Sequence, residues 1–578
     1  MARMTPAKRR IGSRELLDAL LDPGTFVSWD VPPIVVAQTG VYRSALAEAA
    51  AVAGTDESVR TGEGRLRGRR IAVIACEFAF LAGSVGVAAA ERIVGAVERA
   101  TAEGLALVVS PTSGGTRMQE GTVAFVQMVK IVGAVAAHKS AGHPYIVYLR
   151  NPTMGGVFAS WGSLGHITFA EPGALIGFLG PRVYEALYGR PFPPGVQTAE
   201  NLYRSGVIDG VVEVSVFRRI AHRALSVFGG IPDDPKSAAG EHYPGVESIP
   251  AVAGLRSAGD TSSTASSAAR AARKGVNPAV AAPETAAPGT EIPDAETWDA
   301  GGLGAGSVRL GGGQWTGVVT EPVEAWESVR ISRRPERPGI RELLRRSRQR
   351  VPLSGTGQGE ADRTVVLALA RFRGRPCVVF GHDRAHQDPE HTMGPAALRA
   401  ARRSMQLAAE LRLPLVLVID TIGAALSKEA EERGLAPEIA RCIADLVTLD
   451  TPTVAVLLGQ GTGGGALALL PADRVLAATH GWLAPLPPEG ASAIVHRDIG
   501  HAAELAAQQR IRSADLLADG IVDRIVPEYP DAAVEPDKFA RRMVAAIAGE
   551  LTALSAQPAE QLREIRHLRY RRLGLADR

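Results

Sequence analysis

The residues best suited to chemistry in this chain are glycines that occur in the same arrangement twice, 309 residues apart. In each copy a glycine turn follows an apolar run, and adjacent glycines stand 41 residues further on. The turns contain Gly114, Gly115 and Gly423, and the pairs are Gly155-Gly156 and Gly464-Gly465. Adjacent glycines after a buried strand expose backbone N–H groups that no Cβ shields. Because such groups stabilise negative charge developing on oxygen, the duplication predicts two oxyanion holes.

A purely structural role for these glycines is the alternative. A single Gly-Gly pair more often only permits a tight turn or close packing of a strand against a helix. Equal spacing in two copies favours a duplicated functional site instead. We expect helices to begin at Val157 and Ala466, just after the pairs, so that their positive ends assist the N–H groups.

No side-chain catalytic motif accompanies the glycines. The sequence lacks a G-x-S-x-G nucleophile elbow, a Walker phosphate loop and an H-E-x-x-H zinc motif. His382, His386 and His391 are close in sequence, but their spacing does not suit one helical face. We therefore expect solvated loop histidines there rather than metal ligands.

The composition describes a globular chain with few signs of a nucleic-acid or membrane partner. Of 578 residues, 46% are hydrophobic and 22% are charged, and the net charge is only +3. The apolar stretches are interrupted by charges, and the first residues lack a secretion-type apolar core. We expect a cytoplasmic protein. Cys76, Cys377 and Cys442 lie too far apart for a zinc ribbon, so we expect small buried hydrophobic residues and no zinc.

The chain divides into two bodies joined by a linker. Residues 232–310 are rich in Ala, Ser, Pro and Gly and contain few large apolar side chains. Such a segment cannot bury enough surface to offset its ordering entropy, so we expect it to be flexible. The predicted domains are therefore residues 1–231 and residues 311–578.

Both bodies alternate apolar runs typical of strands with longer segments of helical periodicity, which predicts an α/β fold built from a duplicated domain. The predicted strands are residues 70–76, 105–109, 145–149, 365–371, 376–381, 415–420 and 454–458. The predicted helices are residues 88–103, 120–141 and 396–411.

Longer motifs around the glycines resemble a known family. The first body resembles the β half of bacterial acetyl-CoA carboxylase carboxyltransferase, and the second body resembles its α half. The matching segments of the first body are residues 80–86, 113–121, 151–157, 170–178, 180–182 and 197–200. Those of the second body are residues 334–338, 431–434, 459–467 and 488–490. The resemblance covers nearly everything outside the linker and describes a β–α fusion.

The resemblance implies two crotonase-like (ClpP/crotonase) β-β-α spiral domains. It also implies transfer of a carboxyl group from carboxybiotin, held by a carrier protein, to acetyl-CoA or another short acyl-CoA. With acetyl-CoA the product is malonyl-CoA, and the reaction is the first step of fatty acid synthesis. This chemistry agrees with the glycines, because an enolate oxygen and a biotin ureido oxygen each need an oxyanion hole.

The resemblance also implies roles for individual residues. The N–H groups of Gly155 and Gly156 would hold the thioester oxygen, and those of Gly464 and Gly465 the biotin oxygen. Gly114 and Gly115 would line the CoA side. Arg117 would either contact a phosphate of CoA or brace the loop, and both interpretations stay open.

The sequence departs from the family pattern in three places. The amino-terminal four-cysteine zinc ribbon of many β halves is absent. Residues 420–427 read Asp-Thr-Ile-Gly-Ala-Ala-Leu-Ser, where the family has Asp-Thr-Pro-Gly-Ala-Tyr-Pro-Gly, and Ala491 replaces a usual Cys. The loop beside the expected biotin site is thus altered.

The expected partners follow from what the chain lacks. There is no Met-Lys-Met biotinylation sequence and no glycine-rich ATP site, so no covalently bound cofactor is expected. The resemblance implies a separate biotin carboxyl carrier protein and biotin carboxylase, and a homodimer or higher homo-oligomer. Two alternatives remain: a biotin-independent decarboxylase of malonyl thioesters, and a non-catalytic assembly subunit that binds acyl-CoA.

Overall fold

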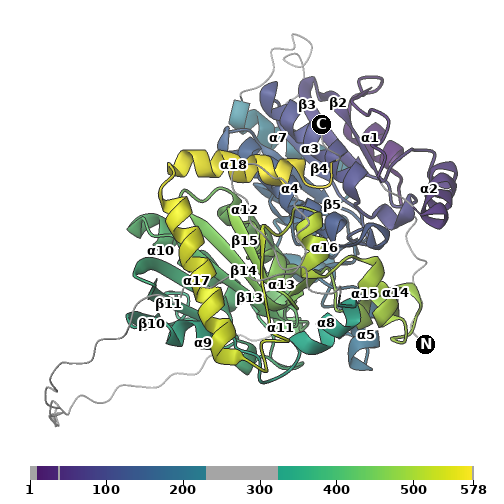
Figure 1. Cartoon of the computed structure of the whole chain (residues 1–578). Coiled ribbons are helices and arrows are strands. Elements are labelled where there is room, and N and C mark those ends of the chain that lie inside the picture. Colours follow the sequence, from purple (N-terminus) through teal and green to yellow (C-terminus); the bar gives the residue numbers. More distant parts are fainter. Residues whose placement is uncertain (1–9, 37–38, 230–322, 576–578) are drawn as a thin grey trace, which may run out of the picture. The chain divides into compact units, whose positions relative to one another are not determined.

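The computed structural model describes residues 10–36, 39–229 and 323–575 (Figure 1). The predicted linker lies outside the described residues. The described residues belong to one compact unit. Within that unit, residues 10–229, which we call the first half, and residues 323–575, the second half, each build a sheet covered by helices.

The first half is organised around a seven-stranded sheet in the order β1-β2-β3-β4-β5-β7-β9. Strands β1 to β3 are antiparallel and the later neighbours are parallel. The bounds are β1 Val27–Ser28, β2 Val59–Leu66, β3 Arg69–Cys76, β4 Leu107–Ser110, β5 Tyr145–Leu149, β7 Ile167–Ala170 and β9 Gly210–Val211. A small second sheet pairs β6 (Thr153–Met154) with β8 (Ile176–Gly177).

The second half repeats this plan. Its sheet runs β10-β11-β12-β13-β14-β15-β17, and β16 pairs with the end of β14. The bounds are β10 Arg350–Leu353, β11 Val365–Phe372, β12 Arg375–His382, β13 Leu415–Thr421, β14 Thr453–Thr462, β15 Arg474–Ala478, β16 Trp482–Ala484 and β17 Arg524–Val526. An antiparallel hairpin leads into parallel strands in both halves, which agrees with the β-β-α spirals that the resemblance implies.

Helices cover both faces of each sheet. The helices of the first half are α1 Ser13–Leu20, α2 Gly40–Ala53, α3 Val87–Ala102, α4 Gly121–Ser140, α5 Pro181–Tyr188, α6 Ala199–Arg204 and α7 Val214–Gly229. Those of the second half are α8 Ala325–Ser332, α9 Ile340–Arg345, α10 Pro395–Leu411, α11 Lys428–Glu432, α12 Leu435–Val447, α13 Gly463–Leu467, α14 Pro488–Val495, α15 Ala502–Gln508, α16 Ser513–Ala518, α17 Pro536–Ser555 and α18 Ala559–Arg572. Because central strands are buried on both faces, β4, β5 and β13 are almost continuously apolar.

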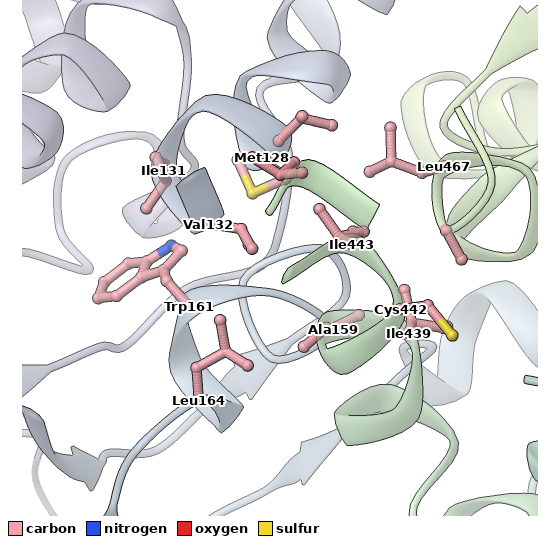
Figure 2. Packing of buried hydrophobic residues seen from close by; sticks show 14 of the residues in the cluster. Met128, Ile131, Val132, Ala159, Trp161, Leu164, Ile439, Cys442, Ile443 and Leu467 are labelled. Carbon is pink, nitrogen blue, oxygen red and sulfur yellow. The ribbon is translucent and has the colours of Figure 1, made fainter. Parts of the chain in front are cut away.

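One hydrophobic cluster runs from the first half into the second. Helices α3 and α4 pack on one face of the first sheet, and α10 and α12 on one face of the second. Figure 2 shows the place where they meet: Met128 and Val132 of α4 lie near Ile443 of α12, with Trp161 close by. The other sheet faces are covered separately, by α1 and α7 in the first half and by α9 and α17 in the second.

The long helix α4 is apolar on all sides because it lies inside this cluster. The segment Met118–Ser140 is long and apolar enough to cross a membrane, but 83% of its apolar window is buried within the protein. Polar groups at its start also connect the halves, since the Thr122 hydroxyl donates to the carbonyls of Leu483 and Gln509, each at 3.0 Å. The composition of α4 is therefore that of a core helix.

The sequence predicted most of the elements near the glycines. All seven predicted strands and all three predicted helices are confirmed, with ends that move by a few residues. The three cysteines are free and buried, as expected. The prediction of helix starts at Val157 and Ala466 is wrong. Residues 155–160 form turns before a short 3-10 helix at Trp161–Ser163, and the second helix, α13, already begins at Gly463.

Candidate active site

The two glycine segments of the first half lie backbone against backbone. Gly115 and Gly155 both have positive φ, +121° and +63°, which only glycine adopts without strain. A Cβ added to Gly115 would lie 3.8 Å from the Gly155 Cα and 3.9 Å from the Gly156 nitrogen. The structure therefore brings together the turn and the pair that the sequence separates by 41 residues.

The N–H groups of this first site are not equally free. Gly114 donates to the Ala82 carbonyl at 2.8 Å and Gly155 donates to the Gly177 carbonyl at 3.1 Å. The Gly115 N–H donates to the Ser113 hydroxyl at 3.0 Å. Within the described residues, only the Gly156 N–H of the predicted pair has no acceptor. In this conformation Gly155 provides the turn and Gly156 provides the donor. Of the two N–H groups that the sequence predicts to hold one oxygen, only that of Gly156 is therefore free to bind it.

Arg117 lies inside the protein rather than at a ligand surface. Its side chain is 1% exposed and forms two hydrogen bonds with the Glu57 carboxylate, at 2.9 and 2.5 Å. It also donates to the Ser84 carbonyl at 2.7 Å. Burial opposes its charge, but the hydrogen bonds that Arg117 donates to Glu57 and the negative charge of that carboxylate outweigh this and raise the pKa of Arg117. Of the two interpretations, this arrangement favours bracing of the loop over contact with a phosphate.

The turn of the second half is built like that of the first. The Thr421 hydroxyl accepts the Gly423 N–H at 3.1 Å, as the Ser113 hydroxyl accepts the Gly115 N–H at 3.0 Å. Gly423 also has positive φ, +137°. Gly115 thus corresponds to Gly423, and Ile422 takes the place of Gly114.

By this correspondence, the second glycine pair begins one residue earlier than predicted from the sequence. Gly463 has a φ of +62°, almost equal to the +63° of Gly155. Gly115 to Gly156 and Gly423 to Gly464 are again both 41 residues apart. The counterpart of Gly155-Gly156 is therefore Gly463-Gly464, and Gly465 stands one position further along.

The N–H groups of Gly464 and Gly465 are both available. They lie in the first turn of α13, where N–H groups have no partner within the helix, and the residue before the helix provides no capping side chain. Nothing in the described part of the chain accepts from either group. By correspondence with Gly156, the Gly464 N–H is the donor of the second site.

The second site lacks the buried arginine of the first. The Ala425 N–H donates to the Met393 carbonyl, as the Arg117 N–H donates to the Val85 carbonyl, so Ala425 occupies the position of Arg117. Asp420 braces this loop instead. Its carboxylate pairs with Arg384 at 3.0 Å and accepts the N–H of Gln460 at 3.1 Å.

The expectation of solvated loop histidines is wrong for His382. It ends β12, is fully buried, and accepts the Asp420 N–H at 3.3 Å. Burial lowers the pKa of His382 to about 4, so the ring is neutral at pH 7. His386 and His391 are exposed and pair with Asp383 and Asp388, respectively.

The ring of Phe178 connects the two sites. Phe178 follows β8 in the first half, and its carbonyl oxygen is 3.9 Å from the position of a Cβ on Gly155. A Cβ on Gly464 would lie 2.9 Å from the same residue's ring. The two glycine sites therefore lie on either side of one residue.

Glu431, from α11 of the second half, holds Phe178 in place. One oxygen of its carboxylate accepts the Phe178 N–H at 2.8 Å and the Gln197 side-chain amide at 2.6 Å. Glu431 is 5% exposed. Burial raises its pKa from 4.5 to about 6, although hydrogen bonds from Gln197 and Phe178 act to lower it. The sequence contained Glu431 within a recognised motif, but nothing in its spacing indicated this role.

A pocket of about 220 Å³ opens beside the second site. Gly423 and Gly463 form part of its wall, together with Thr462 and Phe178. Thr462 is 3% exposed, and its hydroxyl has no hydrogen-bond partner within the described residues. A buried hydroxyl without a partner is costly, so Thr462 is an unsatisfied polar group beside this pocket.

Comparison with known proteins agrees with this duplicated architecture. The family model described as "Carboxyl transferase domain" matches residues 8–228. The model described as "Acetyl co-enzyme A carboxylase carboxyltransferase-like" matches residues 314–574. The two matches cover the two halves in the β–α order that the motifs predict.

Several relatives match over the whole chain. A probable biotin-dependent acyl-coenzyme A carboxylase beta3 subunit of Mycobacterium tuberculosis is 58% identical over 98% of this chain and 99% of the relative. The acetyl-coenzyme A carboxylase carboxyl transferase subunits beta/alpha of Salinispora arenicola are 35% identical over 98% of this chain and 91% of the relative.

Solved structures of carboxyltransferases are also similar. The transcarboxylase 12S structure aligns over 94% of this chain and 90% of that chain, at 18% identity and a TM-score of 0.33. The beta subunit of geranyl-CoA carboxylase from P. aeruginosa aligns at 16% identity and a TM-score of 0.31 over 95% of this chain and 88% of that chain. With both halves matched by family models and relatives aligned over nearly its full length, the chain belongs to the biotin-dependent acyl-CoA carboxyltransferases and has their two crotonase-like domains.

Proposed function

We propose that the chain transfers the carboxyl group of carboxybiotin to acetyl-CoA or another short acyl-CoA, so that acetyl-CoA would give malonyl-CoA for fatty acid synthesis. The observation that supports this proposal most directly is the pair of corresponding turns, which leave one N–H free at Gly156 and another at Gly464, with Phe178 between them. Each site presents at least one free backbone donor, which is the kind of group that stabilises negative charge on an oxygen.

The Gly156 N–H is assigned to the thioester oxygen. When the α-proton leaves, negative charge moves onto that oxygen, and a donor fixed in this turn stabilises it without reorganisation. Gly114, Gly115 and Arg117 shape this turn. In this proposal Gly114 and Gly115 lie beside the CoA side of the site, and Arg117 acts through the loop that it braces.

The Gly464 N–H is assigned to the biotin ureido oxygen, with Gly465 next to it. Transfer breaks the N–CO2 bond of carboxybiotin, and the resulting CO2 forms a new bond to the α-carbon, while the ureido nitrogen takes the α-proton. The free N–H groups of Gly464 and Gly465 are donors that a ureido oxygen can accept from, so the residues present fit a ureido group. The biotin belongs to a separate carrier protein, charged by a separate biotin carboxylase.

The reverse reaction tests the proposal with simple reagents. Incubation of the chain with malonyl-CoA and biocytin should give acetyl-CoA and carboxybiocytin. The corresponding forward assay uses a biotinylated carrier, biotin carboxylase, ATP and bicarbonate. Acetyl-CoA release without biocytin would indicate a decarboxylase instead, and failure of every acyl-CoA with a charged carrier would contradict the proposal.

A further inference from the structure

The pocket beside the second site has an apolar wall drawn from both halves of the chain. The first half supplies Phe178, Leu187 and Tyr188, and the second half supplies Ile422, Leu426 and Leu486. None of the residues that line it carries a charged side chain, and its side-chain polar atoms are the hydroxyls of Tyr188, Thr392 and Thr462. Such a wall fits hydrocarbon and offers no counter-charge to the phosphates of CoA.

The pocket adjoins both the second site and a hydrophobic cluster. Gly463 and Thr462 lie where the Gly464 N–H is assigned to the ureido oxygen. Leu187 and Leu426 belong to a separate hydrophobic cluster that includes Tyr184 and Leu486. The wall therefore includes residues beside the second site and members of this mostly apolar cluster.

The size of the pocket exceeds what an acetyl group needs. An apolar cavity of about 150 Å³ binds benzene, a six-carbon ring. The present pocket has a volume of about 220 Å³. It can therefore take up a chain of about six carbons in addition to the polar atoms at its mouth.

The departures from the family motif fall on this wall. Ile422 and Leu426 stand where the family pattern has prolines, and both line the pocket. Ala425, between them, stands where the pattern has a tyrosine. The substitutions thus add flexible aliphatic side chains to the wall and remove an aromatic side chain from the same loop.

We propose that this pocket holds the hydrocarbon tail of the acyl group, so that the preferred substrate is an acyl-CoA of about six carbons rather than acetyl-CoA. The inference rests on the proposed function and deepens it. An acyl chain whose thioester oxygen lies at Gly156 would pass Phe178 and enter the pocket, with its α-carbon near the second site. Leu426 would then contact the tail and determine its length.

Two substitutions at one position test the assignment in opposite directions. Leu426→Trp fills the pocket from its rim, and Leu426→Ala enlarges it. Straight-chain acyl-CoAs of two to twelve carbons are assayed with biotinylated carrier, biotin carboxylase, ATP and bicarbonate. We expect the wild type to prefer hexanoyl-CoA over acetyl-CoA by tenfold or more in kcat/KM. Leu426→Trp should lower the ratio of kcat/KM for hexanoyl-CoA to that for acetyl-CoA at least tenfold, whereas Leu426→Ala should shift the optimum to longer chains.

The control is Leu411→Trp, which adds the same ring at a leucine that is 50% exposed at the end of α10, outside the pocket wall. It should keep the wild-type profile. A preference of the wild type for acetyl-CoA would overturn the inference and leave the proposed function intact. Equal loss of all acyl-CoAs and of biocytin carboxylation in Leu426→Trp would overturn it too, because the pocket would then hold biotin.

A binding measurement separates the inference from catalysis. Hexanoyl-CoA should raise the midpoint of thermal unfolding above the value with CoA alone, and Leu426→Trp should abolish that difference. If no acyl-CoA is carboxylated while this difference is present, the proposed function fails but the pocket still binds the tail. If hexanoyl-CoA and CoA stabilise the wild type equally, the inference fails.

Discussion

Replacement of Glu431 by glutamine should change how the stability of the protein depends on pH. The carboxylate is 5% exposed, and one of its oxygens accepts hydrogen bonds from Phe178 and Gln197. Burial raises its pKa from 4.5 to about 6. A difference of this size corresponds to about 2 kcal/mol of free energy between the two protonation states. Glutamine has the same shape and keeps an acceptor for the Phe178 N–H, so the variant should fold.

The direction of the effect follows from linkage. Because the pKa is higher in the folded state, the contribution of Glu431 to stability is fully present below about pH 4.5 and is lost as the pH rises through about 6. The wild type should therefore lose up to about 2 kcal/mol relative to Glu431→Gln between pH 4 and pH 8. About 1 kcal/mol of this loss should fall between pH 5.0 and pH 7.5.

Urea unfolding at several values between pH 5.0 and pH 7.5 measures the difference between the two proteins. The matched control is Glu432→Gln, which changes the neighbouring residue. Glu432 also accepts a hydrogen bond from the first half, from Asn201 at 2.9 Å, but its side chain is 27% exposed. If the difference between wild type and Glu431→Gln stays constant or grows in favour of the wild type as the pH rises, the account of a buried, destabilised carboxylate is wrong.

Four further substitutions test the glycine sites and the ion pair that braces the first turn. Gly156→Val keeps the backbone N–H, but its side chain should block the thioester oxygen from reaching it. The expected fall in kcat for carboxyl transfer is 10² or more, which is the cost of one lost oxyanion donor (about 2.7–4 kcal/mol). A thermal-shift assay should still detect CoA binding. Gly464→Ala should lower transfer at least tenfold more than Gly465→Ala. Its added Cβ would lie 2.8 Å from the Ile439 side chain and 2.9 Å from the Phe178 ring, whereas that of Gly465 would lie 2.7 Å from the sulfur of the flexible Met393 side chain. Equal effects of the two substitutions would contradict the assignment of Gly464, rather than Gly465, as the counterpart of Gly156. Glu57→Gln should cost about 1.5–3 kcal/mol in urea unfolding, because Arg117 would lose its charge-assisted hydrogen bonds to Glu57 and keep only the Glu120 carboxylate at 3.7 Å. A change confined to the KM for acyl-CoA would place Arg117 at a phosphate instead.

The sequence was sufficient to predict the strands and helices that position these sites. Runs such as residues 145–149 and 415–420 are apolar because their strands are buried on both faces, and this constraint is local. The exact glycine pair of the second site was not predictable in the same way. Residues 463–465 are all glycine, so their spacing cannot show which one adopts positive φ. That choice depends on the turn at Gly423, which the sequence places 40 residues earlier.

Contacts between distant segments explain why the sequence did not predict which N–H groups stay free or what Arg117 binds. The Gly155 N–H is taken by Gly177, and the Arg117 guanidinium is taken by Glu57, 60 residues upstream. Neither partner forms a motif with the residue that it binds. A glycine pair indicates how many donors a turn can offer, but only tertiary structure determines how many stay free.

Phe178 gives a physical reason why the two halves form one site rather than two. It belongs to the first half, yet its ring lies against Gly464 and its N–H is held by Glu431, both from the second half. A Cβ on Gly464 would lie 2.8 Å from the Ile439 side chain of the second half and 2.9 Å from the Phe178 ring of the first half, so both halves crowd this position. Each half alone would expose the ring or leave the buried carboxylate without its partners. The duplicated glycines therefore define a catalytic arrangement only when both halves are packed together.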